Sequence, residues 1–392
     1  LDDLLNRYAL VYGQGGTVFD RQEHMLVATS DMRDACISRY IHRAWVEHPM
    51  RAIVRVREVG FDPGGKDPEV TCNLWGGWPT KPVAGSCEKL LELLRYMCSG
   101  DDNSETLYNW VLRWIAYPIK VPGAKMKTTL VVHGPQGTGK NMFFEAIMSI
   151  YGQYGRIIDQ AAIEDKFNDW ASRKLFLIAD EVVARAELFH IKNKLKAFIT
   201  GDWIRINPKN MAAYEERNHV NLAFLSNETL PAILEEDDRR HTVIWTPPPL
   251  AAEFYIAVRD ELNNGGAAAL HDYLITQVDL EGFDEHAKPP QSAAKLELVE
   301  QSRDNTSRFF FDLSDGEIPG MRAMPALTVD VYAAYRSWCQ RVGHRAAPMN
   351  KLVGALKRKH SVEIVRERYH DDYGAPQGPH MILMLGGIKE IE

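Results

Sequence analysis

The sequence lacks any apolar run long enough to cross a membrane. Its uncharged apolar stretches, such as 128–132 and 175–179, are far shorter than the roughly 20 residues that a membrane-spanning helix needs. The chain also opens without the basic, apolar and small-residue succession of a secretory signal, and it begins with Leu1 instead of Met. We therefore expect a cytoplasmic protein with no membrane partner, present here as a fragment of a longer chain.

Cysteine and positive charge are also scarce. The five cysteines form no C-x-x-C pair and have no histidines at matching spacing, which argues against a zinc site and against a disulfide framework. The formal net charge of -7 argues against a protein that coats nucleic acid by bulk attraction. Any contact with nucleic acid must be local. The segment 336–368 carries nine Lys or Arg against two Glu, whereas 235–238 is wholly acidic.

Length and pattern predict several domains. The 392 residues correspond to two or three domains at roughly 100 to 200 residues each. Short apolar strands alternate with helical stretches in the central part, which predicts an α/β fold with a largely parallel sheet. We divide the chain into an N-terminal accessory domain of α+β or helical character at 1–85, a helical collar or linker at 86–117, the α/β core at 118–250, a helical segment and linker at 251–327, and a C-terminal domain at 328–392.

A glycine-rich loop between a predicted strand and a predicted helix carries the clearest chemistry. Glycines let backbone N–H groups approach phosphate oxygens, a helix N-terminus adds unpaired donors, and a lysine reaches the terminal phosphates. The spacing of these residues alone is weak evidence for a phosphate-binding loop. It is strengthened by its context, because an apolar strand ending at His133 precedes the loop and an apolar helix from Met142 follows it. The predicted phosphate-binding residues are Gly134, Pro135, Gln136, Gly137, Thr138, Gly139, Lys140 and Asn141.

Two further strands end in polar residues. Asp180 and Glu181 follow one apolar strand, and Asn227 follows the strand at 221–226. We predict that Asp180 holds a hydrated magnesium ion, that Glu181 polarises the attacking water, and that Asn227 hydrogen-bonds this water or the γ-phosphate of ATP. Asn141 stands where Ser or Thr usually binds the metal, so its amide oxygen is a weaker second magnesium ligand. Solvated strand ends and a simple turn amide are the structural alternatives.

These three motifs, in this order within about 95 residues, resemble the superfamily 3 helicases of viruses, phages and plasmids, and most closely the primase-associated phage and poxvirus-type branch. The resemblance implies a P-loop, AAA-like ATPase core. It also implies a β-hairpin whose basic tip contacts DNA, and Lys209 and Asn210 stand at that tip. The family further places an arginine that reaches the ATP of a neighbouring subunit. Arg239 and Arg240 fit, and we favour Arg240, although either could pair with the adjacent acidic residues.

The same resemblance implies an assembly and a task. It predicts an ATP- and magnesium-dependent DNA helicase that acts in phage or plasmid replication, in the host cell cytoplasm if a phage encodes it. The helicase would form a homo-oligomeric ring, expected to be a hexamer, with single-stranded DNA in its channel and 3′ to 5′ movement. The segment 328–392 resembles the small C-terminal domain of these proteins, and its pattern predicts a winged-helix-like domain that contacts duplex DNA. If the natural protein also primes DNA, its primase or polymerase domain would lie upstream of Leu1, because 1–117 shows no separate carboxylate cluster.

Two other functions remain open from the residues themselves. An origin-binding or loader protein could use the same ATPase as a conformational switch without unwinding, and it would bind duplex DNA through 328–370. A P-loop small-molecule kinase would be monomeric, and it would leave the hairpin and the paired arginines unexplained.

Overall fold

The computed structural model describes residues 1–181, 195, 197–209, 212–229, 231–232, 234–368 and 378–385. The chain divides into two compact units. The larger unit comprises Leu1–Ile233 and Asp237–Leu298, and the smaller unit comprises Leu234–Glu236 and Val299–Glu392. Within the described residues, no helix combines the length and apolar character needed to cross a bilayer.

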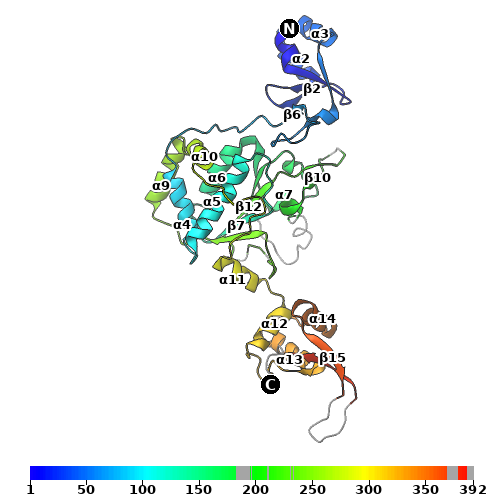
Figure 1. Cartoon of the computed structure of the whole chain (residues 1–392), viewed down its shortest axis with the longest axis vertical. Helices are drawn as coiled ribbons and strands as arrows, with labels where there is room; N and C mark the ends of the chain where they lie inside the picture. The colour runs from blue at the N-terminus through cyan, green and yellow to red at the C-terminus, as the bar shows by residue number, and fades with distance from the viewer. Residues whose placement is uncertain are drawn as a thin grey trace. The chain divides into compact units, whose positions relative to one another are not determined.

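A five-stranded parallel sheet forms the centre of the larger unit, as predicted (Figure 1). Its strands lie in the order β13-β7-β12-β9-β8. Their bounds are β7 (Thr129–His133), β8 (Gly155–Ile158), β9 (Phe176–Asp180), β12 (Asn221–Ser226) and β13 (His241–Trp245). Every residue of β7 and β12 is buried. Such strands are covered on both faces, which explains why they appear in the sequence as continuous apolar runs.

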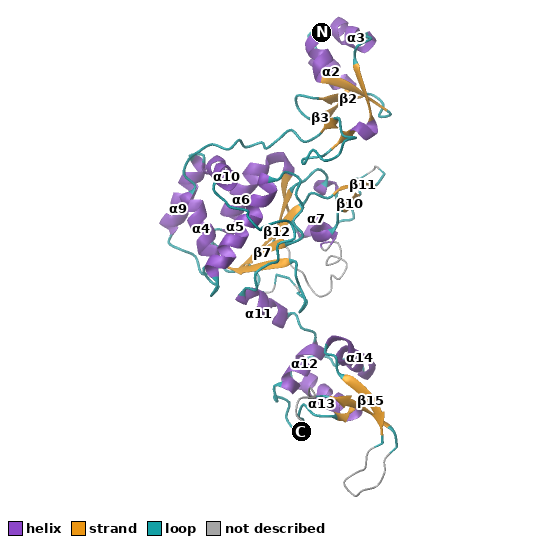
Figure 2. Ribbon diagram, in the orientation of Figure 1, coloured by secondary structure: helices purple, strands orange, loops and turns teal. Residues whose placement is uncertain are grey.

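Helices pack against one face of this sheet (Figure 2). They are α4 (Glu88–Cys98), α5 (Ser104–Lys120), α6 (Lys140–Tyr151), α9 (Ala252–Asn263) and α10 (Gly266–Thr276). Alternate strand residues, among them Leu130, Val132 and Ile178, join the apolar side chains of these helices in one core. The two helices α4 and α5 occupy most of the segment predicted as a helical collar or linker at 86–117. In the segment predicted as helical at 251–327, α9 and α10 are separate helices, because Gly265 adopts a φ of 94° between them.

The N-terminal part of the larger unit contains a four-stranded sheet in the order β3-β2-β1-β4. Its elements are α1 (Asp2–Arg7), β1 (Tyr8–Tyr12), β2 (Thr17–Asp20), β3 (Met25–Ala28), α2 (Thr29–Ala35), α3 (Arg39–Glu47) and β4 (Ala52–Arg55). A 3-10 turn at Val56–Glu58 separates β4 from β5 (Val59–Gly60), which pairs with β6 (Cys72–Asn73).

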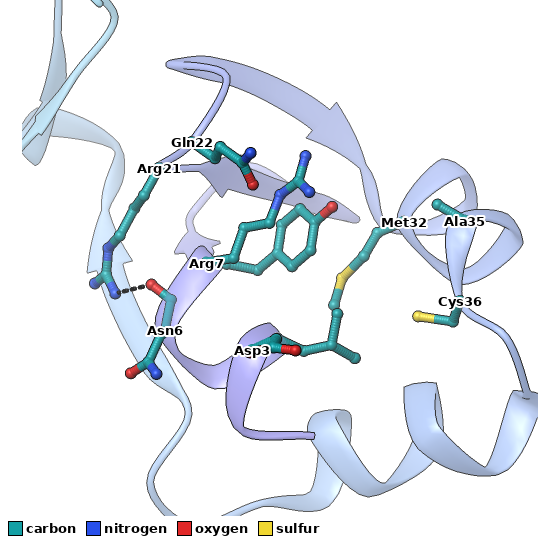
Figure 3. Close-up of a pocket in the computed structure, with 10 residues that line it drawn as sticks. Asp3, Asn6, Arg7, Arg21, Gln22, Met32, Ala35 and Cys36 are labelled. Atoms are coloured by element: carbon teal, nitrogen blue, oxygen red, sulfur yellow. Dashed lines mark hydrogen bonds between the residues drawn. The ribbon is translucent and has the colours of Figure 1, made fainter.

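A cavity of about 660 Å³ is lined mainly by residues of α1 and α2 and by Arg21 and Gln22, which follow β2 (Figure 3). Arg7 lines it, and its guanidinium donates to both carboxylate oxygens of the buried Asp20, at 2.7 to 3.0 Å. Because Asp20 neutralises this arginine, the cavity lacks an uncompensated buried charge at that point.

The described residues of the larger unit also contain several short elements. They are the 3-10 turns Gly152–Tyr154 and Asp169–Ala171, α7 (Gln160–Glu164), the antiparallel hairpin of β10 (Trp203–Ile206) and β11 (Tyr214–Arg217), and α11 (Ala293–Gln301), which runs across the boundary of the two units. A hairpin is thus present where the family resemblance implied one.

The described residues of the smaller unit contain three helices beyond α11 and a three-stranded antiparallel sheet. In chain order these are α12 (Asn305–Ser314), β14 (Ala326–Leu327), α13 (Thr328–Arg341), α14 (Met349–Lys359), β15 (Glu363–Glu367) and β16 (His380–Met384). Phe309, Tyr335, Leu352 and Leu383 are buried in its apolar core. Both α12 and β14 precede residue 328, so this unit is larger than the C-terminal segment that the sequence pattern marked.

Candidate functional site

The candidate site lies at the carboxyl edge of the parallel sheet, where the polar strand ends meet. β12 lies between β7 and β9, and all three run in the same direction. The register places Ser226 opposite His133, and Leu225 opposite Asp180. The glycine loop, the acidic pair and Asn227 therefore emerge side by side. Ligands of open parallel sheets characteristically bind at this edge.

The glycine loop at 134–139 connects β7 directly to α6, as the sequence predicted. Gly134 has a φ of 137°, and a Cβ atom added there would lie 2.4 Å from Oγ1 of Thr246. Gly139 has a φ of 86°, and its added Cβ would lie 2.8 Å from a methyl group of Leu93. Both positions require glycine on grounds of conformation and space. The backbone of the loop therefore packs directly against Thr246 and Leu93, with no room for side chains at these two positions.

Lys140 opens α6 and folds back over the loop. Its ammonium group donates to the carbonyl oxygens of Gly134 and Pro135 at 3.0 and 2.9 Å, and to the hydroxyl of Thr138 at 3.4 Å. Only 5% of the residue is exposed, and this burial lowers the pKa of its ammonium group, while the charge of Asp180 acts in the opposite direction. A buried cation held by carbonyl groups could exchange these partners for the oxygens of an anion.

Asn141 and the acidic pair adjoin this lysine. The side-chain nitrogen of Asn141 donates to Oδ2 of Asp180 at 2.8 Å, which leaves the amide oxygen as the group that could join a cation. Asn227 donates to Oε1 of Glu181 at 3.4 Å. Glu181 has a φ of 53°, in the left-handed region that non-glycine residues rarely adopt, and its side chain is exposed. Such backbone strain is frequent at functional sites.

His133 is a member of this edge that sequence reasoning did not select. It is 3% exposed, its Nδ1 lies 3.2 Å from the carbonyl oxygen of Glu228, and its ring packs edge-on against Trp245. Burial lowers its pKa to about 4, and the charge of Lys140 acts in the same direction. The imidazole is therefore neutral at pH 7 and connects the end of β7 to the segment after β12. The sequence did offer one signal for this residue, because His133 is the last residue before the glycine loop.

The two candidate arginines lie away from the glycine loop. They precede β13, so they belong to the amino end of a strand whose carboxyl end carries Trp245. Five residues of strand span about 16 Å. In the described residues neither Arg239 nor Arg240 forms an ion pair. The side chains of Arg239 and Arg240 therefore do not pair with the acidic residues beside them.

Asp238 instead organises the segment that carries these arginines. It accepts hydrogen bonds from the backbone N–H groups of Arg240 and His241, at 3.1 and 2.9 Å, and from Nδ1 of His241 at 2.8 Å. Its Oδ1 lies 3.3 Å from the ammonium group of Lys295, which is 2% exposed. Burial acts to raise the pKa of Asp238, but the hydrogen bonds of His241 and the charge of Lys295 hold it far below the usual range. Lys295 was missed because it lies more than 50 residues further along the chain.

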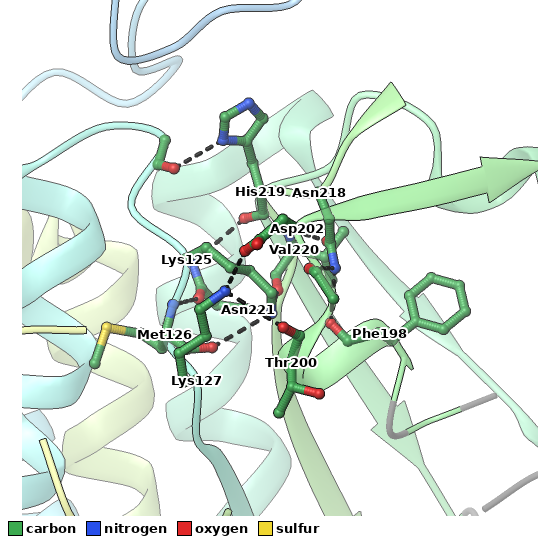
Figure 4. A network of polar contacts seen from close by, with 12 residues as sticks. Lys125, Met126, Lys127, Phe198, Thr200, Asp202, Asn218, His219, Val220 and Asn221 are labelled. Atoms are coloured by element: carbon green, nitrogen blue, oxygen red, sulfur yellow. Dashed lines mark hydrogen bonds and ion pairs between the residues drawn. The ribbon is translucent and has the colours of Figure 1, made fainter. Parts of the chain in front are cut away.

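The hairpin is anchored at the amino end of the sheet (Figure 4). Lys127, just before β7, forms an ion pair with Asp202, just before β10, and its ammonium group also donates to the carbonyl of Thr200 at 3.3 Å. Asn218, after β11, donates to the carbonyls of Phe198 and Gly201 at 3.0 and 2.8 Å. These contacts join the hairpin base to the sheet that carries the candidate site.

Lys209 lies in the connection between β10 and β11, and its side chain is exposed. Asn210, the weaker companion in the prediction, lies outside the described residues. The structure thus brings together Lys140, Asn141, Asp180, Glu181 and Asn227, whereas Lys209 and the two arginines occupy other parts of the larger unit.

Solved structures identify the class of fold. The chain resembles the apo structure of the C-terminal region of NrS-1, with a TM-score of 0.73 and 18% identity over 98% of both chains. An A-form apo structure of the same region gives a TM-score of 0.67 and 20% identity over 94% of both chains. At these identities the likeness shows the fold alone. The protein has the mixed α/β fold with a parallel sheet found in that region.

Sequence comparison then gives a particular relative. The DNA primase-polymerase of Nitratiruptor phage NrS-1 is 32% identical over 167 residues, which cover 42% of this chain. The aligned part spans 23% of the length of that phage protein. Residues 132–240, from the end of β7 to the start of β13, also match the model of a family of unknown function, DUF5906. The sequence match relates part of the chain to a phage DNA primase-polymerase, and the family model covers residues 132–240.

Proposed function

We propose that this chain is the ATP-driven motor part of a phage DNA replication protein, a helicase that moves along single-stranded DNA. The observation that carries the proposal is the meeting of Lys140, Asn141, Asp180, Glu181 and Asn227 beside a glycine loop at one edge of a parallel sheet. A P-loop, AAA-like ATPase uses such a set of groups. The likeness to a phage primase-polymerase supports a task in DNA replication, in the cytoplasm of the host, and leaves room for a primase or polymerase domain elsewhere in a longer protein.

The residues fit ATP and Mg²⁺. The backbone N–H groups of 134–141, apart from Pro135, and the Lys140 ammonium would hold the phosphates, since among the described residues this buried ammonium donates to loop carbonyls and one hydroxyl. Asp180 and the amide oxygen of Asn141 would hold the cation, because hard cations bind carboxylate and amide oxygens. Bound Mg²⁺ would supply neutralisation of the charge that develops on the phosphate oxygens.

Hydrolysis also needs an oriented water. The exposed carboxylate of Glu181 would accept a proton from this water, and Asn227, already hydrogen-bonded to Glu181, would orient it or donate to the γ-phosphate. Positioning and charge stabilisation supply most of the catalysis in phosphoryl transfer. The five converging side chains could bind the phosphates, hold the metal ion and activate the water. They do not supply a second cation to stabilise the negative charge on the transferred phosphoryl group.

A neighbouring subunit would supply that cation. Arg240, with Arg239 as the alternative, lies at the amino end of β13 and therefore about 16 Å of strand away from the phosphate edge of its own subunit. Hydrolysis would then require a ring, with a hexamer as the expected form. Lys209 would contact a phosphate of single-stranded DNA in the ring channel, and the anchored hairpin would move with the sheet.

ATP turnover with and without single-stranded DNA tests the proposal, on protein whose mass is checked by light scattering. We expect stimulation in a ring-sized species. Arg240→Ala should lose basal turnover about 1000-fold or more, as for an arginine finger. Lys209→Ala should keep basal turnover and lose stimulation, while the matched exposed lysine variant Lys288→Ala should behave like the wild type.

Two results would contradict the proposal. Unstimulated turnover by a monomer would favour the small-molecule kinase, and nucleotide-dependent duplex binding without translocation would favour the loader or origin-binding switch. Stimulation that survives in Lys209→Ala would remove the hairpin from the mechanism.

A further inference from the structure

The loop that carries the two candidate arginines leaves the larger unit and returns to it. This loop connects β12 to β13. Its middle, Leu234–Glu236, belongs to the smaller unit, whereas Asp237 and the arginines after it belong to the larger unit. The smaller unit therefore contains a segment that ends only three residues before Arg239 and four before Arg240. Any contact that holds this segment also restricts the arginines.

The residues directly after α11 hold the middle of the loop. The backbone N–H of Leu234 donates to Oγ of Ser302 at 3.0 Å, and the side chain of Leu234 is buried. Oε1 of Glu236 forms an ion pair with Nε of Arg303 at 3.3 Å. The guanidinium carbon of Arg303 also lies 3.8 Å from the centre of the Phe311 ring on α12. This cation–π contact gives the arginine a defined place within the smaller unit.

The first turn of α11 holds the other side of the loop. Nζ of Lys295 lies 3.3 Å from Oδ1 of Asp238 and donates to the carbonyl oxygen of the same residue at 2.8 Å. Asp238 in turn accepts hydrogen bonds from the backbone N–H groups of Arg240 and His241. One stretch of chain, 295–303, thus holds the loop on both sides.

The cations of this stretch also occupy two carboxylates beside the arginines. All four residues at 235–238 are acidic. Glu236 is paired with Arg303, and Asp238 is paired with Lys295. The side chain of Glu236 is 47% exposed, and such partly exposed ion pairs add little to the free energy of unfolding. Stability alone therefore does not explain the pair of Glu236 and Arg303.

The two arginines, in contrast, are not paired. Among the described residues, neither Arg239 nor Arg240 forms an ion pair, and the buried Nε of Arg240 has no hydrogen-bond partner. An arginine that acts on the phosphates of another subunit must stay free of carboxylates in its own chain, because a carboxylate competes with phosphate for the same guanidinium.

We propose that Lys295 and Arg303 are positioning residues for the arginine finger. They hold the loop on both sides and occupy two of its carboxylates, so that Arg240 stays available for the ATP of a neighbouring subunit. This inference rests on the proposed motor function, because it needs an arginine that acts between subunits. Without Arg303, the freed Glu236 would attract the nearby arginines and shift the loop. A misplacement of about 1 Å can reduce a catalytic rate about 100-fold.

Steady-state ATP turnover by the full chain tests the role of Arg303. Arg303→Met removes the cation but can still pack against Phe311, and we expect kcat to fall about 10-fold or more with little change in the KM for ATP. Arg303→Lys should keep most of the turnover, because it keeps the cation. Arg303→Met/Glu236→Gln should recover part of the loss, because it removes the competing carboxylate. Arg308→Ala, which removes an exposed arginine of α12, should behave like the wild type.

Mixed rings separate an effect on the neighbouring subunit from damage to the variant's own phosphate site. Lys140→Ala subunits lack a working phosphate site but carry an undisturbed loop. When they are mixed with Arg303→Met subunits, whose phosphate site is intact, turnover should exceed the sum of the two proteins measured alone. Mixing Arg303→Met with Lys140→Ala/Arg240→Ala should give no such gain.

A second measurement does not depend on turnover. Phenylglyoxal modifies free guanidinium groups, and mass spectrometry follows the reaction at Arg240. We expect slower modification in Arg303→Met than in the wild type, without nucleotide and at a concentration where light scattering shows monomers. Arg303→Met/Glu236→Gln should return to the rate of the wild type.

The outcomes distinguish this inference from the motor function. If Arg240→Ala loses turnover but Arg303→Met turns over like the wild type, the inference is overturned and the motor function stands. The absence of a gain in mixed rings, or an unchanged labelling rate in Arg303→Met, has the same meaning. If Arg240→Ala itself turns over like the wild type, or if the active species is a monomer, the arginine finger and this inference fail together.

Discussion

The side-chain nitrogen of Asn141 donates a 2.8 Å hydrogen bond to Oδ2 of Asp180, and this contact joins the residue after the loop lysine to the end of β9. Asn141 stands where a hydroxyl residue is usual, so the metal ligand at this position would be an amide oxygen. We predict that Asn141→Ala raises the Mg²⁺ concentration needed for half-maximal ATP turnover about 10-fold or more. Asn141→Ser should restore much of the lost affinity. A magnesium titration of turnover measures both, and an unchanged requirement in Asn141→Ala would remove this residue from the metal site.

Substitutions of Lys140 and Glu181 should affect different steps, namely phosphate binding and water activation. Lys140→Ala should weaken ATP binding and reduce turnover, because no other buried cation meets the loop carbonyls among the described residues. Glu181→Gln should bind ATP normally and reduce kcat by about 100-fold or more, because it removes only the proton acceptor. Equilibrium binding of a fluorescent ATP analogue, together with turnover, distinguishes the two. Turnover close to wild type in Glu181→Gln would place the water-activating group elsewhere.

His133 should make stability depend on pH. Its pKa is lowered to about 4 in the folded chain, against 6.5 for the ordinary side chain, and burial is the main cause. Above pH 6.5 both states are neutral, so the group has no effect. Between pH 6.5 and 4 the unfolded chain takes up a proton that the folded chain does not, so stability decreases as the pH falls. The cost at pH 5 is about 2 kcal/mol.

Urea denaturation at pH 7 and pH 5 measures this effect. His133→Gln, which cannot titrate, should lose a smaller part of its stability between the two pH values than the wild type. The pKa values of His219 and His271 are also lowered, first of all by burial, so the decrease should shrink without disappearing. An identical decrease in the variant and the wild type would show that His133 is not buried in its neutral form.

Asp238 and Lys295 should be coupled in both stability and turnover. Lys295→Met leaves a buried carboxylate without its cation, which costs about 3 kcal/mol. The double variant Asp238→Asn/Lys295→Met should recover part of this loss, since it removes both charges. Because Asp238 also holds the backbone of Arg240, the single variant should reduce kcat more than it changes the KM for ATP. Thermal unfolding and steady-state turnover check these expectations, and additive effects of the two substitutions would exclude the coupling.

Local patterns predicted much of the central fold. The strand at 221–226 was recognisable because buried parallel strands are continuously apolar. The helices α4 and α5, directly before the core, were recognisable because helices repeat their apolar residues every three or four positions. The glycine loop was equally visible, since its neighbours are a strand and a helix. The break at Gly265 was harder to place, because helical periodicity continues on both sides of it.

The sequence by itself determined which groups could act at the site, because glycine, lysine and carboxylate chemistry is local to each strand end. Only the tertiary structure decided which of these groups meet. The strand order places β12 between β7 and β9, which brings Asn227 to Glu181 and leaves Arg240 at the opposite end of the sheet. It also brought Lys295 to Asp238 and His133 to Glu228, pairs separated by 57 and 95 residues. No sequence period encodes such pairs, since they follow from how the chain crosses and packs.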